Sequence, residues 1–194
     1  KARCYEYLGY QNSPKQLYQL ALNSGLEGNS LEEKRLKVAV FSSLNRQKDV
    51  DLIARDILRV YNSPERPRDF ELKSSALCNF NRQNEAREIL QNGLEKFPEN
   101  VVLHLNLAGL YGKQEDYKKS IEHAKFALNE GWNQIWVWNT LANAYYFDGK
   151  YKEALEFLNK SIEKHPNDLS SRCLRMKTYA HLKQLDKAEA EMQA

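Results

Sequence analysis

The histidines are the first side chains of this chain to test for chemistry. They stand in four different local contexts and are His104, His123, His165 and His181. None belongs to a His-Glu-x-x-His pattern, so a metal site would need distant residues to converge. The chain also has no glycine-rich phosphate-binding loop and no Gly-x-Ser-x-Gly element. We therefore predict no metal site, no cofactor and no catalytic residue, and the chain is not expected to be an enzyme.

Three cysteines, Cys4, Cys78 and Cys173, are the other candidates for chemistry. Their number is odd, they are far apart, and none belongs to a Cys-x-x-Cys pair. We therefore expect three isolated buried thiols.

The charge balance limits the kind of partner. The chain has 29 basic and 26 acidic residues, which gives a formal net charge of +3. That excess is too small to indicate nucleic-acid or membrane binding by itself. No apolar run approaches the roughly 18 residues that a membrane span needs. We expect a soluble chain, with a cytoplasmic location favoured. The chain begins at Lys1 without a methionine, which suggests trimming, so a targeting sequence could have been removed.

Residues of matching type recur every 34 positions, which indicates the elements that must position any functional side chain. The three clearest sets are Ala86, Ser120 and Ala154; Leu77, Tyr111 and Tyr145; and Pro98, Trp132 and Pro166. A fixed period of this length is typical of a stacked helical array. Such an array builds its core between neighbouring units and leaves a long concave surface, so it is suited to holding a partner.

The clearest unit covers residues 135–168. Apolar residues at helical spacing occupy 138–145, Asp148-Gly149 then breaks the helix, and a second apolar stripe covers 151–161 before Pro166. The small residues Ala142 and Ala154 allow two helices to cross closely. We therefore predict a helix, a turn and an antiparallel helix.

The pattern from Trp138 to Pro166, W-x-x-L-A-x-x-Y followed by G-x-Y-x-x-A and P, resembles a tetratricopeptide repeat. The resemblance implies an all-α fold, a right-handed superhelix or solenoid of antiparallel helix pairs. It is clear over residues 67–168, fair to 194 and weak over 1–66. The departures are Lys73, His104 and Trp132, each at a position where the family has another residue type.

The repeat pattern predicts one helical domain over residues 1–194. We divide it into a partial or divergent pair at 1–33, a divergent repeat at 34–66, repeats at 67–100, 101–134 and 135–168, and an incomplete repeat at 169–194. A helix is expected from Ser13-Pro14 to Gly25. In the repeat at 34–66, Leu36, Val40 and Leu44 indicate the first helix. The stripe Val50, Ile53, Ile57 and Val60 indicates the second, with Asp49 as its N-cap.

The resemblance implies that the first helix of each pair lines the concave groove. The face of these helices left over from packing carries the predicted peptide-binding residues Trp136, Asn139, Asn143, Phe147, Asn106, Lys113, Asn79 and Lys177. Trp136 is the central candidate, because Trp138 already occupies the core position. An exposed indole beside amides is typical of a binding hot spot. Alternatively, Trp136 packs on Trp132 as an aromatic plug between repeats.

Some members of this family bind the acidic tails of chaperones through a clamp of lysines and asparagines. Asn106 matches one clamp position. The expected companions are instead Glu71 and Ser75 before it and Trp136 and Thr140 after it. The chain therefore lacks this carboxylate clamp.

We predict a non-catalytic scaffold that binds an extended peptide or partner helix of an unidentified protein. An alternative is a targeting or regulatory arm of a larger protein whose enzymatic domain lies outside this segment. RNA binding is less favoured, because the basic residues available to the groove are only Arg68, Lys113 and Lys177, against Glu71. Self-association through the exposed ends of the array is a further expectation.

Overall fold

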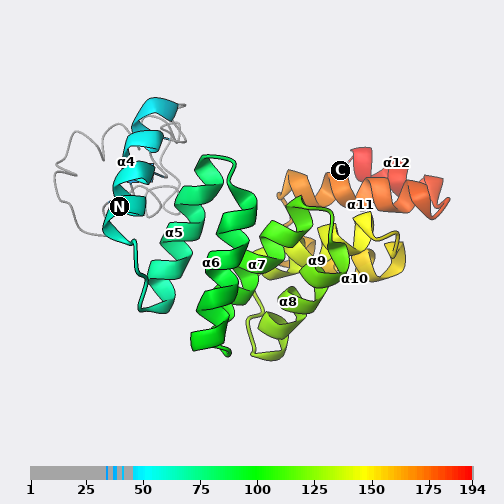
Figure 1. Cartoon of the computed structure of the whole chain (residues 1–194). Helices are drawn as coiled ribbons and strands as arrows, with labels where there is room; N and C mark the ends of the chain where they lie inside the picture. Colours follow the sequence, from blue (N-terminus) through cyan, green and yellow to red (C-terminus); the bar gives the residue numbers. More distant parts are fainter. Residues whose placement is uncertain (1–33, 35–36, 39–40, 42–45, 194) are drawn as a thin grey trace. The chain divides into compact units, whose positions relative to one another are not determined.

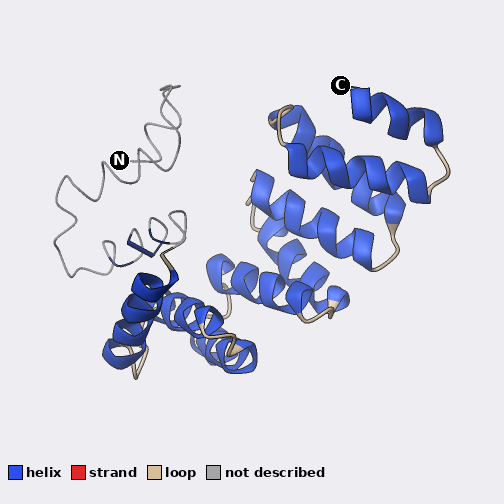
Figure 2. Cartoon of the chain, turned by 90° about the horizontal axis from the view of Figure 1, so that it is seen from above, coloured by secondary structure: helices blue, strands red, loops and turns tan. Residues whose placement is uncertain are grey.

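The computed structural model describes residue 34, residues 37–38, residue 41 and residues 46–193 (Figure 1). The helices of the continuous part are α4 (Gln47–Val60), α5 (Pro67–Asn79), α6 (Gln83–Lys96), α7 (Val101–Lys113), α8 (Tyr117–Asn129), α9 (Ile135–Phe147), α10 (Tyr151–Lys164), α11 (Leu169–His181) and α12 (Leu185–Gln193). The described residues contain no β-strand (Figure 2). None of their helices is long and apolar enough to span a bilayer.

The predicted fold class is confirmed: the described chain is an all-α array of helix pairs. Among the described residues, those up to Ile89 form one compact unit, and those from Leu90 form another. The assignment of all 194 residues to one domain stays a prediction. The expected helix from 14 to 25, and the apolar stripe at Leu36, Val40 and Leu44, lie outside the described residues.

In the first unit, α4 packs against α5 through Ala54 and Ile57 on one side and Leu72 and Ala76 on the other. The predicted second helix of the repeat at 34–66 is therefore present as α4. The proposed N-cap was wrong. The helix begins at Gln47, and Asp49 lies in its first turn, where its carboxylate accepts a hydrogen bond of 2.7 Å from Arg46 Nε.

In the second unit, each first helix packs against the second helix of its pair, α7 against α8, α9 against α10 and α11 against α12. Ala142 and Ala154 have no exposed surface, as expected at close helix crossings. Around them lies a core that includes Trp138, Leu141 and Phe157. These apolar faces hold the first helices in place and orient their remaining faces.

The turns inside the pairs repeat with the sequence period. Asn81, Glu115, Gly149 and Lys183 all have φ values between 57° and 76° and occupy equivalent positions in successive repeats. This left-handed backbone conformation lets the chain reverse its direction directly after each first helix. Only one of the four residues is the glycine that such a conformation favours. The repeat is thus periodic in backbone geometry as well as in residue type.

Candidate functional site

The first helices of the second unit lie side by side, because α7 contacts α9 and α9 contacts α11. Their buried faces point toward the core. We use the term first-helix surface for the remaining face, which comprises Asn106 and Lys113 of α7, Trp136, Asn143 and Phe147 of α9, and Lys177 of α11. The structure thus places seven of the eight predicted binding residues on these neighbouring helices, and six of them belong to the first-helix surface.

The exposed face of α9 is the most apolar part of this surface. Trp136 is 40% exposed and Phe147 is 57% exposed. Asn143 is also exposed and lies between them in the helix, at a spacing of seven and four residues. Residues at these spacings share one side of a helix. Two large aromatic side chains therefore flank an amide on a single face.

Trp136 has features of both alternatives, because it packs on Trp132 and is also exposed. Its ring meets that of Trp132 edge to face, with 5.8 Å between centroids. Its Nε1 donates a hydrogen bond of 2.5 Å to the side-chain oxygen of Gln134. Since two-fifths of the side chain remains exposed, Trp136 is held by Trp132 and Gln134 and still presents an aromatic surface to solvent.

The polar side chains of the first-helix surface differ in their exposure and in the hydrogen bonds that they form. Asn143 Nδ2 donates a hydrogen bond of 2.8 Å to the backbone oxygen of Asn139, which fixes the amide and leaves its side-chain oxygen as an acceptor. Lys113 and Lys177 are exposed and form no ion pair within the described part of the chain. Asn106 is only partly exposed, and its Nδ2 is buried without a hydrogen-bond partner among the described residues.

Asn139 has a different environment from the other predicted binding residues. Its side-chain oxygen accepts hydrogen bonds from Ser161 Oγ at 2.6 Å and from Ser171 Oγ at 3.0 Å. Its Nδ2 lies 3.4 Å from Asp168 Oδ2. Ser161 and Ser171 are buried. The Asn139 amide therefore joins α9 to α10 and α11, and its hydrogen bonds are directed inward.

Asp168 completes this polar cluster at the start of α11. A hydrogen bond from Ser171 is the main cause that holds the pKa of Asp168 below its usual range, with a smaller contribution from Asn139 and against the opposing effect of burial. The sequence contained a signal for this cluster. Ser161 replaces Ala127 of the preceding repeat at a core position, and a buried hydroxyl needs a hydrogen-bond partner.

Sequence reasoning also missed a row of aromatic contacts at the C-terminal ends of the first helices. Tyr117 stacks on Phe147 at 5.6 Å, and at the equivalent positions of the next repeat Tyr151 stacks on His181 at 4.5 Å. Tyr146 connects the two pairs, because its hydroxyl lies 3.1 Å from His181 Nε2 and its ring meets Phe147 edge to face. The recurrence of these rings with the repeat period was the available signal.

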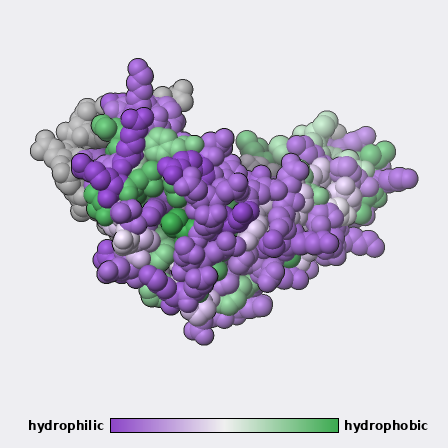
Figure 3. Space-filling model, in the orientation of Figure 1, coloured by the Kyte–Doolittle hydropathy of each residue, from purple (hydrophilic) through white to green (hydrophobic). Residues whose placement is uncertain are grey.

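Asn79, the eighth predicted residue, belongs to the first unit. It is exposed at the end of α5 and lines a pocket of about 150 Å³ with Glu71, Ser75 and Ile57 among others. Hydrophobic residues gather over α4 and α5 on the face seen in Figure 3. The predicted binding face of α5 therefore borders a small apolar pocket of its own unit.

Two of the histidines pack together inside the α7–α8 pair. His104 Nδ1 lies 2.8 Å from His123 Nδ1, and the His104 ring stacks on Phe126 at 3.8 Å. Among the described residues no three His, Cys, Asp or Glu side chains are grouped as metal ligands would be. The expectation for the cysteines was wrong at Cys173, which is exposed on α11, while Cys78 is partly buried.

The comparisons with known proteins agree with this architecture. Residues 99–167 match the sequence profile of the family described as Tetratricopeptide repeat. Among solved structures, the chain is similar to MamA from Desulfovibrio magneticus RS-1, with 13% identity, 86% of this chain and 93% of that chain covered, and a TM-score of 0.66. It is also similar to TTC0263, a thermophilic TPR protein of Thermus thermophilus. There the identity is 19%, the coverage is 93% of this chain and 95% of that chain, and the TM-score is 0.66.

Residues 99–167 therefore belong to the tetratricopeptide-repeat family. The matched residues contain the α7–α8 and α9–α10 pairs, and the structural likeness extends the same fold beyond them. At such low identities the likeness concerns the fold alone. The fold supports a role as a protein-interaction scaffold.

Proposed function

We propose that the chain is a non-catalytic scaffold that binds an extended peptide or a partner helix across the first-helix surface. The observation that carries this proposal is the exposure of Trp136 and Phe147 on one face of α9, with Asn143 between them. Large exposed aromatic side chains on a rigid element are enriched at binding hot spots. Repeats of this family generally serve as non-catalytic scaffolds, which supports the same role here.

Each group on this surface has a distinct part in the proposal. Trp136 and Phe147 supply apolar anchors, and the side-chain oxygen of Asn143 accepts a hydrogen bond from a peptide N–H. Lys113 and Lys177 favour acidic residues flanking the apolar segment of the ligand. The Asn106 amide adds a further polar group beside them. Asn139, whose hydrogen bonds are directed inward, positions α9 against α10 and α11.

The test begins with a random peptide library selected on the full chain, followed by measurement of the dissociation constant of the best peptide. Trp136→Ala should weaken binding about thirtyfold, since loss of a central aromatic anchor commonly costs about 2 kcal/mol. Asn143→Ala should weaken it less. The control is Leu185→Ala, which truncates an exposed apolar side chain on α12, outside this surface.

Equal binding by Trp136→Ala and the parent chain would exclude the first-helix surface as the site. A large drop in melting temperature on Trp136→Ala would instead show that the contact with Trp132 is structural. Phe147→Ala, which removes a more exposed ring, then decides the question: unchanged affinity for the selected peptide contradicts the proposal.

A further inference from the structure

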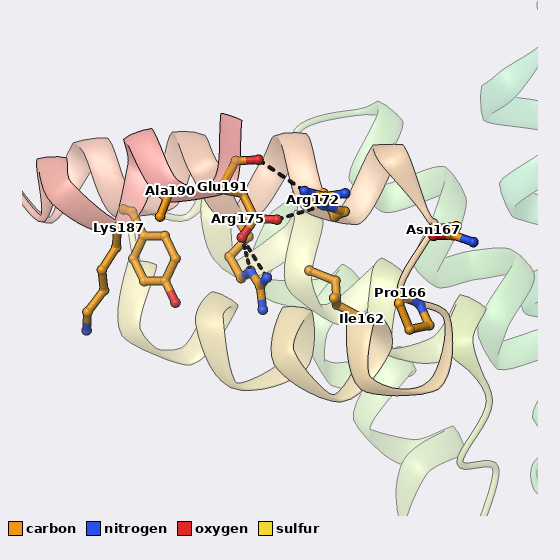
Figure 4. A pocket seen from close by; sticks show the side chains of 9 residues that line it. Ile162, Pro166, Asn167, Arg172, Arg175, Lys187, Ala190 and Glu191 are labelled. Carbon is orange, nitrogen blue, oxygen red and sulfur yellow. Dashed lines mark hydrogen bonds and ion pairs between the residues drawn. The ribbon is translucent and has the colours of Figure 1, made fainter. Parts of the chain in front are cut away.

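A second pocket lies at the C-terminal end of the array, between α10, α11 and α12 (Figure 4). It has a volume of about 530 Å³ and is open to solvent. The lining residues that matter here are Ile162, Arg172, Arg175, Tyr179, Lys187 and Glu191. It is therefore built from the last helix pair and the second helix of the pair before it.

Two large side chains of the preceding repeat are replaced at this pocket. Trp132 and Trp138 correspond, one repeat later, to Pro166 and Arg172. In the preceding repeat Trp138 is buried and Trp132 packs against the core. Proline and arginine leave the equivalent space open and make it polar. A pocket of about 280 Å³ occupies the equivalent place three repeats earlier, between α4, α5 and α6, so the pocket beside α12 differs in its basic lining.

The charges around the pocket do not cancel. Glu191 has a side chain that is only 7% exposed, and it accepts hydrogen bonds from Arg172 Nε at 2.9 Å and Arg175 Nε at 2.8 Å. Lys187 adds a third cation. Three positive groups against one carboxylate leave the lining with an excess of positive charge.

Several hydrogen-bond donors of the lining remain available. Within residues 46–193, no hydrogen bond engages Arg172 Nη1, the Tyr179 hydroxyl or Lys187 Nζ. The Lys187 ammonium instead lies 5.6 Å from the centre of the Tyr179 ring. Figure 4 shows Lys187 and Arg172 toward opposite ends of the pocket, with Arg175 between them. Donors spread along a pocket suit a ligand with more than one negative group.

We propose that this pocket binds an acidic peptide segment of a partner protein, whose carboxylates pair with Arg172 and Lys187 while its backbone lies over Ile162 and Tyr179. Charge complementarity selects this occupant. The pocket is distinct from the first-helix surface. Arg175 and Tyr179 each lie two residues from Lys177 in α11, about 200° around the helix, and therefore on another face.

The test uses a peptide of six glutamates, with a peptide of six glutamines as the neutral control, added to the full isotope-labelled chain. Hexaglutamate should produce saturable shifts of the backbone amide signals of residues 172–191, and hexaglutamine should not. Lys187→Gln should weaken hexaglutamate binding roughly fivefold, since one exposed charge pair near 4 Å is lost. Lys118→Gln, which changes another exposed lysine on α8, is the matched control.

Glu191→Gln sharpens the test, because it removes the one carboxylate that competes for the two arginines. It should strengthen hexaglutamate binding roughly fivefold. If this variant detaches α12, seen as loss of hydrogen-exchange protection at 185–193, Lys187→Gln alone decides. The proposal is overturned if the shifts do not saturate, or if Lys187→Gln and Lys118→Gln respond alike. Equal shifts of residues 172–191 with inorganic phosphate would also overturn it, because the pocket would then be a general anion site.

Discussion

In the helix pairs α9–α10 and α11–α12, side chains at equivalent positions hold the two helices together, but they are apolar in the first pair and charged in the second. In α9–α10 the contact is apolar and consists of Trp138, Leu141 and Phe157. One repeat later, the contact in α11–α12 is ionic and consists of Arg172, Arg175 and Glu191. The same backbone arrangement therefore tolerates a complete change of side-chain chemistry.

The α7–α8 pair gives a third solution at the same positions. His104 and His123 stand where α9–α10 has Trp138 and Phe157. His104 Nε2 faces the Pro98 carbonyl oxygen at 2.9 Å, which can only accept, so this nitrogen carries a proton. Nδ1 of His104 lies 2.8 Å from Nδ1 of His123, so one of these two nitrogens donates and the other accepts. The same two positions of the repeat are therefore occupied by an apolar pair in α9–α10, by two imidazoles in α7–α8 and by an ion pair in α11–α12.

The three pairs have the same fold, but their contacts should differ in how much they contribute to stability. Full burial of a large apolar side chain contributes about 1.5–3 kcal/mol. A buried ion pair contributes less, because desolvation of both charges offsets their attraction. We therefore expect the α9–α10 pair to be the most stable of the three and the α11–α12 pair to open first. The predictions below test this order.

The largest difference should come from equivalent truncations at the two contacts. Leu141→Ala removes a fully buried side chain and should lower the free energy of unfolding by about 2–5 kcal/mol. Arg175→Ala, at the equivalent position of the next repeat, leaves Glu191 paired with Arg172 and should cost less. Urea denaturation followed by circular dichroism measures both. Equal losses would mean that the two contacts stabilise their pairs equally.

Overpacking the helix crossings should have a smaller effect. Ala154→Leu inserts a larger side chain at a crossing without exposed surface and should destabilise the chain by about 1–3 kcal/mol. Ala188→Leu is the matched variant in α12, where the alanine is partly exposed. It should leave the denaturation midpoint nearly unchanged. A similar loss at both sites would show that the last pair is as tightly packed as the middle one.

The three contacts should also differ in their response to pH. Burial is the main cause that lowers the pKa of His123 below 6.5, and the charge of His104 adds to it. The folded state thus binds fewer protons than the unfolded state. The stabilisation by neutral His123 is full above about pH 6.5 and is lost as the pH falls through the lower folded value.

Glu191 responds in a more acidic range. Burial would raise the pKa of Glu191, but hydrogen bonds from Arg172 and Arg175 outweigh it and hold the pKa below 4.5. Its contribution is present above about pH 4.5 and is lost as the pH falls through the lower folded value. On acidification, hydrogen-exchange protection should therefore decrease at a higher pH in α7–α8 than in α11–α12 and change least in α9–α10, whichever pair opens most readily at neutral pH. The opposite order would contradict these assignments.

The smallest effect concerns the turns of the same two pairs. Gly149 and Lys183 occupy the same left-handed position, and only glycine adopts it without steric cost. Gly149→Ala should destabilise the α9–α10 pair by about 1 kcal/mol. Lys183→Gly should stabilise the α11–α12 pair by a few tenths of a kcal/mol. Thermal melts of the two variants measure the difference, and destabilisation by Lys183→Gly would argue against strain at that turn.

Some features of the binding surface were predictable because they depend on helical spacing alone. Trp136, Asn143 and Phe147 share a face of α9 as their spacing requires, and the exposure of Trp136 followed from Trp138 being buried. Asn139 was predicted to line the same face. Its amide instead bonds to Ser161 and Ser171 of two other helices. Nothing in the sequence of α9 indicates where those helices place their hydroxyls.

The sequence by itself determined the repeat, its period and its helix pairs, because periodic apolar stripes, small residues at crossings and turn residues act over short distances along the chain. Only the tertiary structure decided what the residues that depart from the repeat pattern contact. The Arg172, Arg175 and Glu191 cluster, the His104 and His123 pair and the pocket beside α12 each require side chains from different helices to meet. Such meetings depend on the packing of whole helices, and a local pattern does not encode them.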